Sequence, residues 1–72
     1  MRLVPGDSVT ATHDVGDARS GLVVRGTDGI VAARDVGQQS EDTYTVVFTS
    51  HGFLSDTETT VSRLSSADLR KS

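Results

Sequence analysis

The sequence predicts a small all-β domain, folded as a partly open barrel of about five strands that ends in a short helical turn. Several short runs alternate apolar with polar residues and are rich in Val and Thr, which is typical of strands with one buried face. Two glycines, Gly26 and Gly29, bracket a tight turn from which an apolar run leaves directly. In so short a chain, curling the sheet is the economical way to hide its edges.

The length limits how much stability a core can supply. With 72 residues we expect one domain, residues 1–72. A chain of this size buries only about 60% of the surface that it exposes when unfolded. It contains no cysteine, so neither a disulfide framework nor a thiolate metal site contributes. We therefore expect further stability from closure of the sheet, from a protein partner, or from self-association into a homo-oligomer.

Charge and hydropathy narrow the classes of partner. Ten acidic residues against seven basic ones give a net charge of −3, and both signs are dispersed along the chain. Affinity for a phosphate backbone depends on clustered cations, so this dispersal disfavours a nucleic-acid partner. No apolar run approaches the roughly 20 residues that cross a bilayer, and the N-terminus lacks the apolar core of a signal peptide. We expect a cytoplasmic protein without membrane association.

The first predicted strand covers residues 8–13. After the Pro-Gly-Asp turn signal at 5–7, the residues alternate with period two. One face carries serine and threonine, and the other carries Val9, Ala11 and His13. We expect a strand with one buried face, and His13 at its end is expected to be hydrogen-bonded or solvated.

Residues 14–24 break the alternation with two glycines and several small polar residues. They are too short and too glycine-rich for a helix, so we expect a long excursion loop. The apolar residues near its end should tuck back under the sheet; these are Leu22, Val23 and Val24. A loop of this length in a compact domain suggests a functional role.

The glycine turn leads into a predicted strand over 30–36, followed by a polar hairpin loop over 37–42. The next strand, 43–49, has the clearest pattern of the chain. Threonines occupy most of one face. The opposite, buried face carries Tyr44, Val46 and Phe48.

The last third is predicted as a loop over 50–56, a weakly patterned strand over 57–63, a helical turn over 65–69 and a frayed end. Ser65 can cap the helical turn, and Asp68 suits the positive start of a helix. Two leucines should close the bottom of the core, Leu64 and Leu69. The centre of the core is expected from Val9, Val31, Val46, Phe48 and Val61.

The order of these elements resembles an SH3-like barrel. The resemblance covers nearly the whole chain and rests on four segments: Gly6-Asp7-Ser8-Val9, Gly26-Thr27-Asp28-Gly29-Ile30-Val31, Tyr44-Thr45-Val46-Val47-Phe48 and Ala67-Asp68-Leu69. It is similar to a group of small bacterial barrels that includes the photosystem I accessory subunit, the variable chain of ferredoxin–thioredoxin reductase and the nitrile hydratase β-subunit barrel. The resemblance implies a non-catalytic accessory or adaptor domain that docks on a larger protein. The chain lacks the tryptophan and the aromatic run of signalling SH3 domains, whose aromatic-lined groove binds proline-rich ligands.

Motifs for catalysis, metal or cofactor binding are weak. The only group that could form a metal or acid–base site is His13-Asp14 with His51 and Asp56, and the two histidines have no ligand spacing. No Gly-x-Ser-x-Gly motif occurs. The Gly26–Gly29 turn leads into a strand pattern, whereas phosphate-binding loops lead into a helix. We expect a protein that is not an enzyme and that holds no metal or cofactor.

The residues expected to bind a partner lie in two loops. Phe53 and Leu54 are large apolar residues in a polar loop, and they either fold back as a core plug or stay exposed as an interface anchor. His51 lies beside them, and the arginines expected to contribute near the long loop are Arg19 and Arg25. We predict a protein-interaction or accessory domain. The alternative is a small nucleic-acid-binding barrel of the KOW or cold-shock sort, in which Arg34 joins these two arginines in a basic patch.

Overall fold

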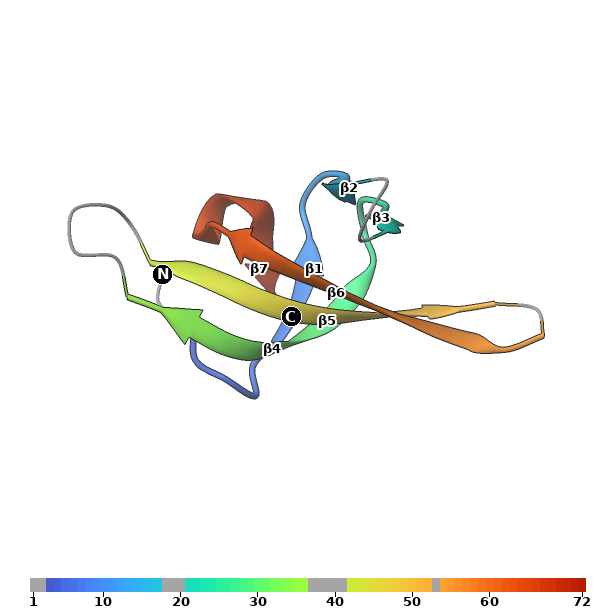
Figure 1. Ribbon diagram of the computed structural model, residues 1–72, viewed down its shortest axis with the longest axis horizontal. Coiled ribbons are helices and arrows are strands. Elements are labelled where there is room, and N and C mark those ends of the chain that lie inside the picture. The colour runs from blue at the N-terminus through green and yellow to red at the C-terminus, as the bar shows by residue number, and fades with distance from the viewer. Residues whose placement is uncertain (1–2, 18–20, 37–41, 53) are drawn as a thin grey trace.

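The computed structural model describes residues 3–17, 21–36, 42–52 and 54–72 (Figure 1). The elements are seven strands and one short 3-10 turn, with the following bounds: β1 (Ser8–Ala11), β2 (Val15–Asp17), β3 (Gly21–Val23), β4 (Asp28–Asp35), β5 (Thr43–His51), β6 (Asp56–Leu64), the 3-10 turn η1 (Ser66–Asp68) and β7 (Leu69–Lys71). The predicted all-β class is confirmed.

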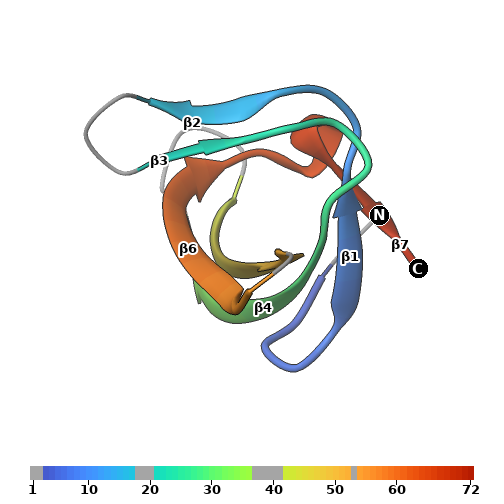
Figure 2. The same ribbon diagram turned by 90° about the vertical axis from the view of Figure 1, so that its right-hand side faces the viewer.

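Five strands form one antiparallel sheet in the order β6-β5-β4-β1-β7, and β2 pairs with β3 in a separate two-stranded sheet. The first and last strands of the chain lie side by side, with Ala11 opposite Leu69. Seen from one end, the large sheet curls around the core and the β2–β3 hairpin lies across it (Figure 2). Its two edge strands are β6 and β7. This is the predicted partly open barrel.

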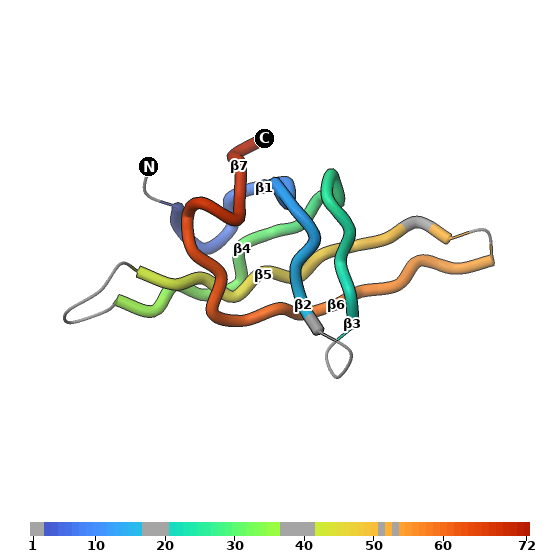
Figure 3. The backbone as a smooth tube through the Cα atoms, turned by 90° about the horizontal axis from the view of Figure 1, so that it is seen from above, coloured from blue at the N-terminus to red at the C-terminus, as the bar shows by residue number. Residues whose placement is uncertain are grey.

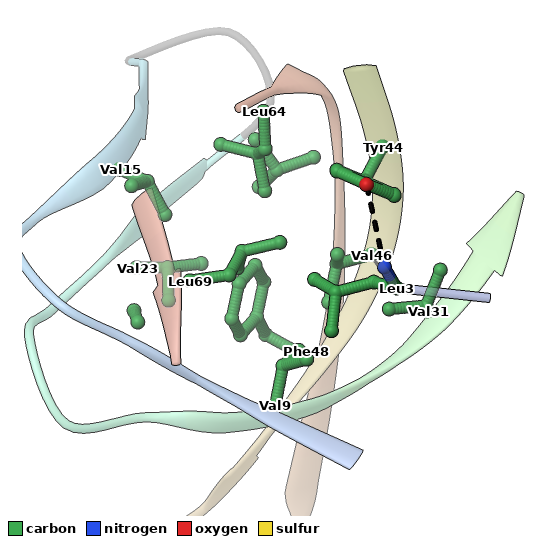
Figure 4. Close-up of a cluster of buried hydrophobic side chains, with 12 residues drawn as sticks. Leu3, Val9, Val15, Val23, Val31, Tyr44, Val46, Phe48, Leu64 and Leu69 are labelled. Atoms are coloured by element: carbon green, nitrogen blue, oxygen red, sulfur yellow. Dashed lines mark hydrogen bonds between the residues drawn. The ribbon is translucent and has the colours of Figure 1, made fainter. Parts of the chain in front are cut away.

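The core fills the inside of the curled sheet (Figure 4). All five residues expected at its centre are buried, and so are Tyr44, Leu64 and Leu69. The sequence pattern missed Leu3, which is completely buried. Its backbone N–H donates a 3.4 Å hydrogen bond to the hydroxyl of Tyr44. The N-terminal segment is held against β4, because the Gly6 N–H donates to the Val31 carbonyl at 2.8 Å.

The two glycines of the predicted turn have different roles. Gly26 has a φ of +91° and makes the turn between β3 and β4. Gly29 lies inside β4, which begins at Asp28 rather than at the predicted residue 30. A Cβ at Gly29 would lie 2.8 Å from Val46 Cγ1 and 2.9 Å from Phe48 Cδ1. Gly29 therefore allows β4 and the Phe48 ring to approach each other.

The prediction of a first strand reaching His13 is wrong. β1 ends at Ala11, and the Thr12 N–H donates instead to the Asp68 carbonyl at 3.0 Å. The chain turns at this point, and His13 is exposed. A hydrogen bond to a residue far along the chain ends the strand where the local pattern would continue it.

The prediction of an unstructured excursion over 14–24 is also wrong. This segment contains the β2–β3 hairpin, with Val15 opposite Val23. Val15 and Val23 are buried as part of the core. Leu22 and Val24, which were expected under the sheet, point outward with exposed fractions of 65% and 57%.

The C-terminal third is more ordered than the sequence indicated. The strands on either side of the predicted loop at 50–56 are longer than expected, so that β5 reaches His51 and β6 starts at Asp56. Pairing of β5 with β4 ends at Phe48. Residues 49–51 and 56–58 therefore form a two-stranded arm that extends beyond β4, on the right in Figure 3. The predicted frayed end is strand β7 up to Lys71.

The predicted helical turn is confirmed as η1. Ser65 is its N-cap, and the Ser65 N–H donates to Asp68 Oδ2 at 2.9 Å. The Asp68 N–H in turn donates to the Ser65 carbonyl at 3.0 Å. This reciprocal pair closes the turn between β6 and β7.

Candidate functional site

The residues predicted to bind a partner do not form one continuous surface. Leu54 lies at the tip of the arm and is 92% exposed, so the core-plug alternative is wrong for this residue. His51 is the last residue of β5 and pairs with Asp56 in the backbone register. Phe53 and Arg19 lie outside the described residues. In Figures 1 and 3 the tip of the arm is well separated from the β2–β3 hairpin.

Arg25 lies in the turn between β3 and β4. Its backbone N–H donates to Asp14 Oδ1 at 2.8 Å, which ties the two ends of the β2–β3 hairpin together. Its side chain is exposed and lines a shallow hollow next to Thr12 and Arg70.

Two of the three arginines of the alternative nucleic-acid interface, Arg25 and Arg34, lie far apart, and the third, Arg19, lies outside the described residues. Arg25 precedes β4 and Arg34 lies near its other end. At roughly 3.3 Å per residue, the length of β4 separates them by about 20 Å. Arg34 also forms an ion pair with Asp42 at 2.9 Å. The described geometry therefore provides no shared basic patch from these two residues.

The β2–β3 hairpin presents an apolar outer face that the sequence analysis did not identify. Leu22 lies opposite Gly16 in the hairpin register. Gly16 has a φ of +93°, and a Cβ there would collide with the Gly21 carbonyl oxygen. The residue directly opposite Leu22 therefore has no side chain to cover it. Val24, the residue directly after β3, is also exposed.

The inner face of the same hairpin packs against the core and against β6. Val15 and Val23 are buried in the core. A Cβ on Gly21 would lie 3.2 Å from Thr59 Cγ2, so the start of β3 lies close against β6. The hairpin thus offers two exposed aliphatic side chains on a support whose other side is packed. The signal in the sequence was the run of three consecutive aliphatic residues at 22–24, because alternation cannot bury all three.

The turn between β1 and β2 is attached to η1. Thr12 Oγ1 donates to the Ala67 carbonyl at 2.8 Å, and the His13 Nε2 atom is paired with Asp68 Oδ1. The pKa of His13 is raised, first by this hydrogen bond with Asp68 and then by the one with the Asp14 carbonyl. Partial burial of Asp68 works to raise its pKa, but hydrogen bonds from Ser65 and His13 outweigh that effect, and the pKa is lowered.

Candidate groups for chemistry do not assemble into a site. The predicted group of His13, Asp14, His51 and Asp56 is split, because the last two lie on the arm and His13 lies beside Asp68. Within the described ranges, no three His, Asp or Glu side chains are placed to hold a metal ion.

On the outer face of the sheet, a hollow is lined by Ser8, Asp28, Gly29, Ile30, Thr49 and Ser72. The nearby Thr10 hydroxyl donates to Asp28 Oδ1 at 2.7 Å.

Comparison with protein-family models, with curated proteins and with solved structures finds no match to this chain. Among the residues that the structure describes, there is no helix with the length and apolar character of a membrane span.

Proposed function

We propose that this chain is a non-catalytic protein-binding domain that docks on a larger protein through the outer face of its β2–β3 hairpin. One observation carries the proposal: Leu22 and Val24 are exposed, whereas Val15 and Val23 of the same hairpin are packed in the core. Exposed apolar side chains on a preformed support lose little conformational freedom on binding and are typical interface anchors.

The arrangement of the strands supports an accessory role. The order β6-β5-β4-β1-β7, with a 3-10 turn before the last strand, is compatible with the SH3-like barrel that the sequence resembles. The large sheet encloses a core filled by side chains, which leaves hairpins and turns as the places where a partner can be recognised. Leu54 at the tip of the arm is a second contact point for the same class of partner.

The proposal is tested with the double variant Leu22→Ser/Val24→Ser. Both side chains are exposed, so the variant should fold while losing the apolar surface. The matched control is Ile30→Ser/Val36→Ser, which removes one exposed aliphatic side chain within β4 and one directly after it. The tagged proteins are cross-linked in native extract and the captured proteins are quantified by mass spectrometry. Recovery of the specific partner should fall by about tenfold or more for the hairpin variant only.

Two other results would contradict the proposal. Equal recovery with the hairpin variant and the control would show that Leu22 and Val24 are not anchors. Binding of DNA or RNA with an affinity that falls steeply with salt would favour the nucleic-acid alternative. Sedimentation velocity on the purified protein identifies the case in which the partner is a second copy, because the hairpin variant would then convert an oligomer into a monomer.

A further inference from the structure

Two hydrogen bonds from Thr12 and one contact of the His13 ring join the β1–β2 turn to η1. Of these three contacts, the one made by the His13 ring involves a group that titrates near neutral pH. The Thr12 N–H donates to the Asp68 carbonyl at 3.0 Å, and Thr12 Oγ1 donates to the Ala67 carbonyl at 2.8 Å. Neither of these bonds titrates. The third contact is the His13 ring, whose proton content changes near neutral pH.

The surroundings of the His13 ring require two N–H donors. Nδ1 lies 2.9 Å from the Asp14 carbonyl oxygen, which is only an acceptor. Nε2 faces Asp68 Oδ1. The other oxygen of that carboxylate accepts hydrogen bonds from the Ser65 N–H and Oγ, at 2.9 and 3.1 Å. A neutral imidazole has one N–H and leaves one acceptor facing a lone pair, whereas the imidazolium satisfies both.

The acidic groups around the ring favour the imidazolium. On its own turn the nearest acid is Asp14, and from η1 it is Asp68; both raise the pKa of His13. The described cations near this turn are Arg25 and Arg70, which line the hollow beside Thr12 and act in the opposite direction. The backbone of Arg25 is bonded to the Asp14 carboxylate, so the turn, η1 and the base of the β2–β3 hairpin are linked through adjacent residues.

We propose that His13 is a proton-dependent clasp: as imidazolium it donates to both Asp68 and the Asp14 carbonyl, and as neutral imidazole, with a single N–H, it holds only one of them and loosens the start of the β2–β3 hairpin. β2 begins at Val15, two residues after the clasp. Asp14, between them, holds the Arg25 N–H at the other end of the hairpin. Loss of the His13 contact therefore loosens the hairpin at its base while the core face stays packed. The inference concerns the free protein and does not depend on the proposed function.

The test follows the His13 ring and the hairpin amides in the same titration of the purified protein. Ring signals are recorded by NMR between about pH 5 and 9, and amide exchange is measured over the same range and corrected for the intrinsic effect of pH. The His13 signal is identified by its absence in His13→Gln. We expect its midpoint above the ordinary 6.5, and protection at Val15 and Val23 that falls about twofold to fivefold through that midpoint. Protection at Val46 in the core is the internal control.

Two variants separate the clasp from a general loss of stability. Asp68→Asn should bring the midpoint of His13 back toward its ordinary value. His13→Gln has no titrating ring and should show hairpin protection that is independent of pH in this range. The proposal is wrong if the His13 midpoint is ordinary, if hairpin protection does not follow it, or if His13→Gln keeps the dependence of the unmodified protein.

Discussion

Gly29 of β4 lies directly opposite Phe48 of β5, and a Cβ at position 29 would lie 2.9 Å from Phe48 Cδ1 and 2.8 Å from both Val46 Cγ1 and the Val47 carbonyl oxygen. Phe48 is among the largest fully buried side chains of the core. Because Gly29 has no side chain, β4 can pass close to the Phe48 ring directly after the turn at Gly26. The approach of the two strands is thus set by a missing side chain on one and a bulky one on the other.

We predict that Gly29→Ala lowers the free energy of unfolding by about 1–3 kcal/mol, because its Cβ overlaps Val46, the Val47 carbonyl oxygen and Phe48. Urea denaturation measures the change. Phe48→Ala alone should also destabilise the protein, because it leaves a cavity in the core. The double variant Gly29→Ala/Phe48→Ala should cost less than the sum of the single variants, since one of the three overlaps is removed. Strict additivity would contradict the close packing of this pair.

We predict that Gly16→Ala disrupts the β2–β3 hairpin, whereas Gly26→Ala costs only the strain of its backbone. Both glycines have a φ near +90°, but only at Gly16 would the Cβ meet another atom, the Gly21 carbonyl oxygen. Gly26→Ala should cost about 1–2 kcal/mol. Gly16→Ala should cost more, and amide exchange should show lost protection at Val15 and Val23. Equal costs for the two variants would show that the hairpin tolerates a side chain at position 16.

We predict that Leu3→Ala costs about 2–5 kcal/mol of unfolding free energy, because Leu3 is fully buried and its removal leaves a cavity. The neighbouring Val4→Ala is the matched control, since Val4 is about half exposed and should change stability by no more than about 0.5 kcal/mol. Thermal and urea unfolding measure both. Similar small effects would mean that the N-terminal segment does not belong to the core.

We predict that the His13–Asp68 pair makes stability depend on pH in a defined window. The raised pKa of His13 adds stability that is complete below 6.5, its unfolded value, and is lost as pH rises through the folded value. The lowered pKa of Asp68 adds stability that is present above 3.8 and is lost as pH falls through the folded value. The contribution of the pair to the free energy of unfolding is therefore greatest between pH 3.8 and pH 6.5.

Urea unfolding of the unmodified protein and of His13→Gln/Asp68→Asn, at a series of pH values, measures the contribution of this pair. The double variant should show a smaller change with pH. Asp35→Asn, which removes an exposed carboxylate of β4 and leaves the pair intact, is the control for the loss of one acidic group. If all three proteins showed the same dependence of unfolding free energy on pH, the His13–Asp68 pair would not be its cause.

Much of the barrel could be predicted from the sequence because strand alternation is a local property. The side chains of Val46 and Phe48 lie two residues apart on one face of a strand, whatever the rest of the chain does. The cap of η1 was predictable for the same reason, since Ser65 and Asp68 are three residues apart. The candidate binding surface was located less well, because exposure of Leu22 depends on Gly16 in the paired strand.

The pattern of residues alone established the all-β class, the strands at 43–51 and 56–64 to within two residues, and the main core side chains, because each follows from spacing along a strand. Contacts between distant residues decided the rest. Thr12 ends β1 by bonding to residues 67 and 68, the chain end becomes β7 by pairing with β1, and Leu3 enters the core beside Tyr44. Each depends on a partner 41 or more residues away in the chain, and no local spacing can encode such a hydrogen bond.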